Sequence, residues 1–273
     1  MNEEYCSLLA NDTWDLVPLP KGGKLVRCRW VYKTKFGPDG KVDRHKARLV
    51  AKVFSQVEGI DYTETFSPVS KINSIHLVLS LAASFKWEVH QMDVKSAFLH
   101  GYLHEEIYME QPPSFIQKDS SLVCHLRKSL YGLKQAPRAW YAKMDRFLLD
   151  NGFSRCHSDN TVYTKKVGKP FTILVLYVDD IILIGSDPNL INHVKSSLKK
   201  KFEMIDLGHL HYFLGLQVLQ SKKGITLSHS KYACDLLRHF HMEDCKPNPS
   251  PFQSRVKISM TCTSLEVDAI LYC

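Results

Sequence analysis

Two adjacent carboxylates interrupt the most apolar stretch of the 273-residue chain. Asp179 and Asp180 stand in the middle of FTILVLYVDDIILIGS, residues 171–186, between two runs of strand-forming residues. Two like charges at this spacing repel each other, so the arrangement calls for a cation nearby. An exposed Asp-Asp turn at the tip of a β-hairpin is the alternative. The residues alone therefore leave a choice between a metal site and a simple turn.

A third carboxylate favours the metal site. Asp93 ends the strand-like run WEVHQMD, and VKSAFLHG follows it without the alternation of a surface loop. Three carboxylates at the ends of adjacent strands form an oxygen-rich site that suits Mg²⁺. Two such ions about 3.5–4 Å apart stabilise both the attacking and the leaving oxygen of a phosphoryl transfer. The carboxylates thus predict magnesium-dependent chemistry on phosphate esters.

The net charge indicates the kind of partner. The formal charge is +8 and the pI is near 9.0, which favours association with nucleic acid. Between Lys21 and Lys52 there are eleven Lys or Arg residues against two Asp. Residues 24–36 alternate basic with apolar side chains, and a turn at 37–40 leads into a second run, RHKARLVAKVF. This predicts a basic hairpin, with an unpartnered solvated face as the alternative.

Cysteine spacing and the N-terminus bear on the compartment. The eight cysteines form no CxxC pair and no zinc-ligand spacing, so neither a disulfide framework nor a structural metal is indicated. The first residues, MNEEYCSLLAND, lack the pattern of a signal peptide. No apolar run reaches the roughly 18 residues that span a bilayer. We expect an intracellular protein that is not secreted.

The apolar periodicity predicts an α+β fold with an antiparallel sheet covered on one side by helices. We expect a hairpin with arms 171–177 and 181–184, and Val178 to Asp180 at or beside its tip. A second hairpin turns at residues 222–224. Helices are predicted from a cap at Ser70 to about Phe85, from Pro137 to before Gly152, after an Asp187 cap, and from about Ser230 to Phe240.

Three segments together resemble a known family. YVDD (177–180), QMDVKSAFLHG (91–101) and SLYGLKQAPRAWY (129–141) are similar to the central motifs of the reverse transcriptase of copia-type long-terminal-repeat retrotransposons. NDTWDLVPLP, KARLVAK, GIDYTETFSPV and YFLGL also match that family, in order, over nearly the whole chain. A single four-residue match is weak, whereas the ordered set is specific.

The resemblance implies a right-hand polymerase architecture of fingers and palm with a partial thumb. It also implies boundaries: fingers in 1–86 and 112–137, palm in 87–111 and 138–220, partial thumb and tail in 221–273.

The implied activity is RNA-directed DNA synthesis. A primer 3′-hydroxyl would attack the α-phosphate of a deoxynucleoside triphosphate, and pyrophosphate would leave. The implied partners are an RNA template, a DNA or transfer-RNA primer and the triphosphates, with no membrane. The implied place is the cytoplasm, within a virus-like particle in an intact element. Asp93 and Asp179 would be the principal ligands of two Mg²⁺ ions, Asp180 would complete the acidic cluster, and the Val94 carbonyl would add a ligand.

The resemblance also assigns binding residues. Phe98 would block a ribose 2′-hydroxyl, although a core aromatic is the alternative. Lys41 and Arg48 would grip the triphosphate, and Arg44 or Lys46 could take either role. Ser96, Ala97, Tyr131 and Gly132 would line the nucleotide pocket. Gln135, Pro137, Arg138, Tyr177, Tyr212, Phe213, Leu214 and Gly215 would contact primer or template. A helix-entry turn is the alternative for Tyr131, Gly132 and the stretch from Gln135 to Arg138, and a core strand is the alternative for Tyr212 to Gly215. Retroviral relatives carry Gln where Tyr131 stands.

Two departures from the family pattern leave other functions open. Val53 replaces a glycine that the family usually has, which strains the backbone if φ is positive there. The chain stops at 268–272, where the family's next segment would begin, so we expect a polyprotein fragment. One alternative is an inactive remnant that only binds nucleic acid. Another is a different Mg²⁺-dependent enzyme such as a nuclease, which has no need of the Phe98 gate.

Overall fold

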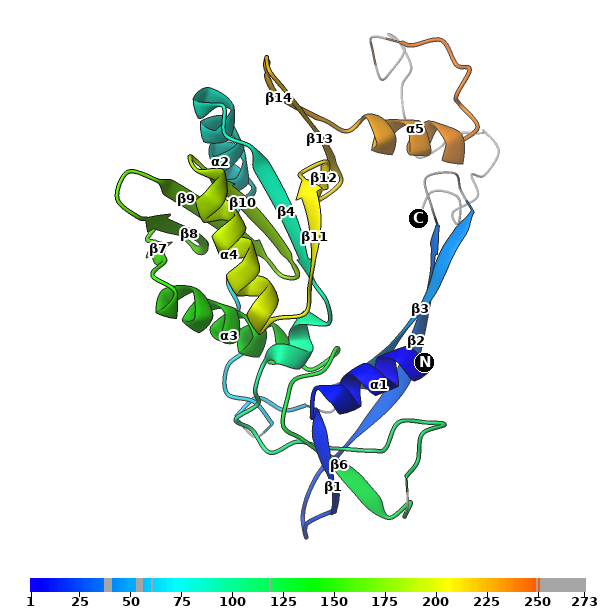
Figure 1. Cartoon of the computed structure of the whole chain (residues 1–273). Helices are drawn as coiled ribbons and strands as arrows, with labels where there is room; N and C mark the ends of the chain where they lie inside the picture. The colour runs from blue at the N-terminus through cyan, green and yellow to red at the C-terminus, as the bar shows by residue number, and fades with distance from the viewer. Residues whose placement is uncertain (37–40, 53–55, 60, 118, 249, 251–273) are drawn as a thin grey trace. The chain divides into compact units, whose positions relative to one another are not determined.

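The described part of the chain falls into two separate units. The computed structural model (Figure 1) describes residues 1–36, 41–52, 56–59, 61–117, 119–248 and 250. The first unit, Met1–Ser228, holds three sheets, and the second begins at His229. The expected turn at 37–40 and Val53 lie outside the described residues. Among the described residues, no helix combines the length and apolar character needed to cross a bilayer.

A six-stranded sheet carries the acidic motifs. Its strand order is β11-β4-β10-β9-β8-β7, and all its neighbouring strands run antiparallel. The predicted hairpin is confirmed as β9 and β10, with Val178 and Asp179 between the two strands. The strands are β4 (Val89–Val94), β7 (Ser154–Cys156), β8 (Asp159–Lys166), β9 (Phe171–Tyr177), β10 (Asp180–Gly185) and β11 (Met204–His209).

Helices cover both faces of this sheet, so the expectation of cover on one side was wrong. Ile181 and Leu183 of β10 pack with α3 (Ala136–Asp150) and α4 (Pro188–Lys201) on one face. Ile182 and Ile184 pack with α2 (Ile72–Phe85) on the other. The physical reason is visible in the residues: a strand that is apolar at every position, without alternation, has two faces to bury.

The basic hairpin is part of a second sheet. Five strands lie in the order β1-β6-β5-β2-β3, and the predicted hairpin is confirmed as its β2–β3 pair. Helix α1 (Asn2–Ala10), which the sequence did not reveal, contacts β3 and contributes Leu8 to the core of this sheet. The strands are β1 (Trp14–Pro18), β2 (Leu25–Phe36), β3 (Val42–Lys52), β5 (Tyr108–Met109) and β6 (Leu122–Leu126).

The first unit also contains a small sheet, and the described residues of the second unit include one helix. The small sheet consists of β12 (Tyr212–Phe213), β13 (Leu216–Ser221) and β14 (Gly224–Ser228), which confirms the predicted turn after residue 221. In the second unit, α5 (Ser230–His239) matches the predicted last helix and has no buried residue. A 3-10 helix, η2 (Ala97–His100), follows β4 in the first unit.

Of the four predicted helix starts, those of α3, α4 and α5 are confirmed. The Asp187 carboxylate accepts a hydrogen bond from the Asn189 backbone N–H at 2.9 Å and caps α4, and α3 has its proline in the first turn. The cap predicted at Ser70 was wrong. Helix α2 begins at Ile72, and Asp159 of β8 accepts hydrogen bonds from Lys71 N and Ser74 Oγ. A carboxylate from a distant strand thus replaces a local cap.

Candidate active site

The β9–β10 turn and the end of β4 bring the acidic residues together. Asp180 opens β10 and lies directly opposite Asp93 of β4. The Val94 backbone N–H donates to the Asp179 carbonyl at 2.8 Å, which fixes the turn against β4. Val178 has a φ of +53°, a left-handed conformation that is unusual for a β-branched residue. The predicted meeting of three carboxylates at adjacent strand ends is therefore present.

The raised pKa values and an unpaired oxygen of these carboxylates favour a bound cation. Burial, together with the neighbouring charges of Asp93 and Asp180, raises the pKa of Asp179 to about 6. Burial also raises the pKa of Asp93 and of Asp180. The Asp179 Oδ1 atom is buried and has no hydrogen-bond partner. A buried acceptor without a donor, among like charges, fits a divalent metal ion with oxygen ligands.

Gln91 is a neighbour of the acidic cluster that sequence reasoning missed. Its Nε2 donates to Asp180 Oδ1 at 3.0 Å, and this bond lowers the pKa of Asp180 against the effect of burial. Gln91 precedes Asp93 by two residues in β4, so the two share a face of the sheet. Period-two counting from Asp93 would have identified it.

One face of the β2–β3 hairpin supplies positive charge to the site. Side chains alternate between the two faces of a strand, and the register places Arg48, Lys46 and Arg44 on the same face. Lys46, Lys35, Arg44 and Arg48 all lower the pKa of Asp93. The cationic face consists of Arg27, Arg29, Lys33, Lys35, Arg44, Lys46, Arg48 and Lys52.

Arg48 is held by an aromatic pair. Its Cζ lies 4.6 Å from the centroid of the Tyr131 ring, and the edge of that ring meets Phe98 at a centroid distance of 4.9 Å. Burial, together with the neighbouring charge of Asp179, raises the pKa of Tyr131 to about 12. Arg48 also lowers the pKa of Asp179. The structure thus brings together three predicted site residues, Arg48, Tyr131 and Phe98; Lys41 lies just before β3, and its role stays a prediction.

Glu4 of α1 adds a carboxylate that no sequence motif indicated. Burial raises the pKa of Glu4, whereas Lys46, Arg48 and the Leu49 backbone N–H lower it. Its Oε1 is buried without a hydrogen-bond partner, and so is Arg48 Nε. Glu4 therefore lies within the electrostatic range of Lys46 and Arg48 and reduces the net positive charge around them.

The turn before α3 packs tightly against β3 and contacts Gln56 and Asp61. Gly132 has a φ of +95°, and a Cβ there would lie 2.3 Å from the Ala51 carbonyl oxygen, so only glycine fits. Gln135 is fully buried, with its amide bonded to Gln56 and to the Asp61 carbonyl. Both residues shape the turn that carries Tyr131. Their contacts to nucleotide or template stay predictions.

Four other predicted site residues differ in their burial and in their contacts. Ala97 is buried in the core, whereas Ser96 is half-buried in a left-handed conformation at the start of η2. Pro137 is half-buried in the first turn of α3. Arg138 pairs with Glu105 at 2.8 Å, and its Nε is buried without a partner. The Ala97 side chain is thus placed for packing, and Arg138 is tied to a carboxylate of this chain.

The YFLGL segment forms the tight turn between β12 and β13. Leu214 and Gly215 have φ values of +50° and +80°, which match a two-residue hairpin turn with both central residues left-handed. Leu214 and Tyr212 are exposed, whereas Phe213 is buried. The Phe213 ring meets that of Tyr177 edge-on at 5.8 Å. This contact connects the turn to the strand that leads into the acidic cluster.

A second group of possible metal ligands lies farther along β4. Atoms of Glu88, His90 and His209 lie within 4.8 Å of one another. Lys195 Nζ is 3.1 Å from His90 Nδ1, and an ammonium group can only donate, so Nδ1 accepts. In neutral His90 the proton is then on Nε2, which faces Glu88 at 3.4 Å. The single in-plane lone pair of neutral His90 is therefore already used by Lys195, so His90 has no free ligand atom for a metal and the group forms a polar network.

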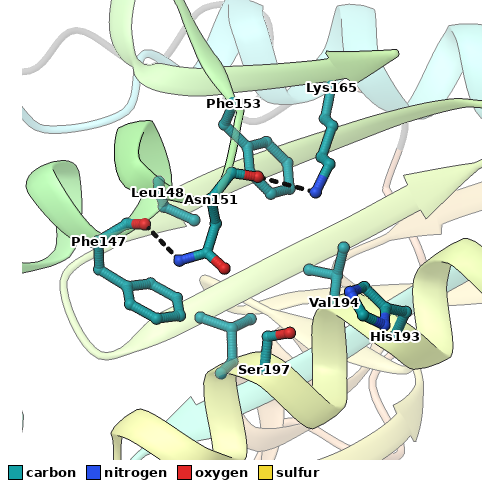
Figure 2. Close-up of a pocket in the computed structure, with 9 residues that line it drawn as sticks. Phe147, Leu148, Asn151, Phe153, Lys165, His193, Val194 and Ser197 are labelled. Atoms are coloured by element: carbon teal, nitrogen blue, oxygen red, sulfur yellow. Dashed lines mark hydrogen bonds between the residues drawn. The ribbon is translucent and has the colours of Figure 1, made fainter. Parts of the chain in front are cut away.

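A small cavity lies between α3, β8 and α4 (Figure 2), and no residue of the acidic cluster lines it. Its volume of about 10 Å³ is that of a single water molecule. Asn151 closes it by donating from Nδ2 to the Phe147 carbonyl, and Lys165 donates to the Asn151 carbonyl, both at 2.8 Å. This cavity is a packing gap beneath the helices and offers no substrate site.

Comparisons with known proteins show the family of the chain. Residues 11–254 match the family model "Reverse transcriptase (RNA-dependent DNA polymerase)". The chain is 48% identical over 263 residues to the Pol polyprotein from transposon TNT 1-94 of Nicotiana tabacum, covering 95% of this chain and 20% of that one. It is 44% identical over 262 residues to the Pol polyprotein from transposon RE1 of Arabidopsis thaliana, covering 95% and 18%. The chain thus spans about a fifth of these relatives.

A solved structure of telomerase from Candida albicans, in complex with a TWJ fragment of telomeric RNA, is also similar. It aligns with a TM-score of 0.40 and 12% identity, and covers 90% of this chain and 55% of that one.

Proposed function

Because the chain belongs to the reverse transcriptase (RNA-dependent DNA polymerase) family, we propose that it extends a primer along an RNA template as the polymerase domain of a copia-type Pol polyprotein. The observation that carries this proposal is the acidic cluster of Asp93, Asp179 and Asp180, which lies within the field of the cationic β2–β3 face. The cluster suits metal-dependent phosphoryl transfer, and the cations suit a polyanionic substrate. The fingers, palm and thumb boundaries expected from the resemblance are part of this proposal.

Asp93 and Asp179 would hold two Mg²⁺ ions, with Asp180 and the Val94 carbonyl as further oxygen donors. When bound, the ions would stabilise charge on the reacting phosphate and on the primer oxygen. Gln91 keeps Asp180 oriented by its hydrogen bond. The orphaned Asp179 Oδ1 supports the fit of a cation to this donor set.

Lys46 and Arg48 would bind the triphosphate and stabilise the leaving pyrophosphate. Both lower the pKa of Asp93 and Asp179, so their charge reaches the position where the α-phosphate must lie. Phe98 would limit the space beside the sugar because Tyr131 holds its ring from the side. The turn at Leu214 and Gly215 would support the primer end. The bond formed joins the primer 3′-oxygen to the α-phosphorus, and the bond broken releases pyrophosphate.

Primer extension tests the proposal. Purified protein is incubated with poly(rA)/oligo(dT), dTTP and Mg²⁺, and the wild type is compared with Asp179→Asn and with Asp150→Asn. Asp150 is an exposed carboxylate at the end of α3, so its variant is the matched control. We expect extension by the wild type and by Asp150→Asn but not by Asp179→Asn. Equal extension by all three would refute the assignment, and binding of primer–template without extension by the wild type would favour the inactive remnant.

A further inference from the structure

The turn that presents Asp179 is held from outside the acidic cluster by one indole. Trp140 of α3 is buried, and its Nε1 donates to the Val178 carbonyl at 2.7 Å. On the other side of the same turn, the Val94 N–H donates to the Asp179 carbonyl at 2.8 Å. The two successive carbonyls of the turn are therefore fixed by two different elements, α3 and β4.

These two hydrogen bonds hold a backbone conformation that is unfavourable for valine. Val178 is left-handed at φ +53°, and its side chain is exposed, so packing of the valine itself contributes little to keeping it there. A β-branched residue in this conformation relaxes unless its surroundings over-determine it. Relaxation would rotate the peptide that precedes Asp179 and turn the carboxylate away from Asp93.

We infer that Trp140 is a positioning residue for the proposed metal ligand Asp179, and that its indole N–H keeps the turn in the metal-binding conformation. The inference rests on the proposed function in taking Asp179 as a ligand, but it concerns the metal site before any substrate is bound. Trp140 touches neither metal nor nucleotide in this assignment. Its ring is otherwise occupied by Phe202, at a centroid distance of 5.4 Å, and by His100 at 5.9 Å.

The experiment compares two Trp→Phe variants of the full chain. Trp140→Phe keeps an aromatic ring in the core but removes the N–H. Trp30→Phe is the matched control. Trp30 lies in β2 of the five-stranded sheet, and its Nε1 also donates to a backbone carbonyl, that of Pro113, at 2.9 Å. Binding of Mn²⁺ is titrated by electron paramagnetic resonance without primer or nucleotide, and primer extension is measured separately.

We expect Trp140→Phe to bind Mn²⁺ about five- to tenfold more weakly, the scale of one lost buried hydrogen bond, while Trp30→Phe binds as the wild type does. In primer extension, Trp140→Phe should lower kcat and leave the KM for dNTP near the wild-type value. Adding Val178→Asn should restore Mn²⁺ binding to Trp140→Phe, because asparagine tolerates the left-handed conformation. A purely structural role for Trp140 would not be rescued by a change at an exposed turn residue.

Three results would overturn the inference: wild-type Mn²⁺ affinity in Trp140→Phe, equal losses in both Trp→Phe variants, or no Mn²⁺ binding by the wild type. If Trp140→Phe does not fold, Val178→Asn alone decides. The inference then predicts unchanged or tighter Mn²⁺ binding with a higher Tm, and weaker binding overturns it. Mn²⁺ binding with the predicted pattern but without any primer extension would leave this inference standing and refute the proposed function.

Discussion

Replacement of Asp179 by asparagine should stabilise the metal-free protein while it abolishes activity. Burial and the neighbouring carboxylates raise the pKa of Asp179 from 3.8 to about 6. Each pKa unit corresponds to about 1.36 kcal/mol, so the ionised carboxylate costs the folded state about 3 kcal/mol above pH 7. The folded state binds this proton more tightly than the unfolded chain does. Stability from this group is therefore greatest below about pH 4 and declines as the pH rises through about 6.

Asparagine removes that charge and the pH dependence that comes with it. At pH 8 without metal, Asp179→Asn should raise the free energy of unfolding by up to about 3 kcal/mol, or on the order of 6–12 °C in Tm for a domain of this size. Near pH 5 the gain should fall to roughly half, because part of the wild-type carboxyl is then protonated. Added Mg²⁺ should stabilise the wild type and leave the variant unchanged, since only the wild type retains the ligand.

Thermal melts at pH 5 and pH 8, with and without Mg²⁺, measure these differences. Asp150→Asn is again the control because its carboxylate is exposed, and its Tm should match the wild type at both pH values. A variant that is less stable than the wild type at pH 8, or that gains equally at both pH values, would show that Asp179 is not electrostatically strained in the folded state.

Three further changes test other parts of the site. Phe98→Val should increase incorporation of ribonucleotides relative to deoxyribonucleotides in primer extension; loss of folding instead would show that the ring serves the core. Gly132→Ala should destabilise the fold by at least about 1–3 kcal/mol in denaturant titrations, because the new Cβ meets the Ala51 carbonyl and φ is positive; a melt like that of the wild type would contradict this. Glu4→Gln should lower the KM for dNTP about two- to fivefold without raising kcat, since it removes a negative charge near Arg48; an unchanged or higher KM would count against it.

Most of the acidic cluster could be predicted from local sequence patterns. The apolar runs around residues 177–180 predicted the hairpin and the position of its tip. The position of Asp93 at the end of a strand-like run predicted that it lies beside that tip. Gln91 was also within reach, because it shares a strand face with Asp93. These features depend on residues that are close in sequence, so the apolar period of the strands and the turn residues are enough to predict them.

The rest depends on contacts that only the fold creates. Asp159 caps α2 from a strand more than 80 residues later in the chain, so Ser70 was chosen wrongly. Trp140 was identifiable as a core residue, but its bond to the Val178 carbonyl requires the packing of α3 beneath the turn. Glu4 lies in a short helix without a clear apolar period, and its place beside β3 is a tertiary outcome.

The contacts among Arg48, Tyr131 and Phe98 have an evolutionary consequence. The tyrosine ring lies against the guanidinium and against the phenylalanine at the same time, so the triphosphate binding proposed for Arg48 and the sugar selection proposed for Phe98 would depend on the same ring. A substitution that relaxes sugar choice then disturbs phosphate binding as well, and the two effects do not add independently. If the proposed roles hold, a change in sugar selection at Phe98 would be tolerated best together with a compensating change at Tyr131 or Arg48.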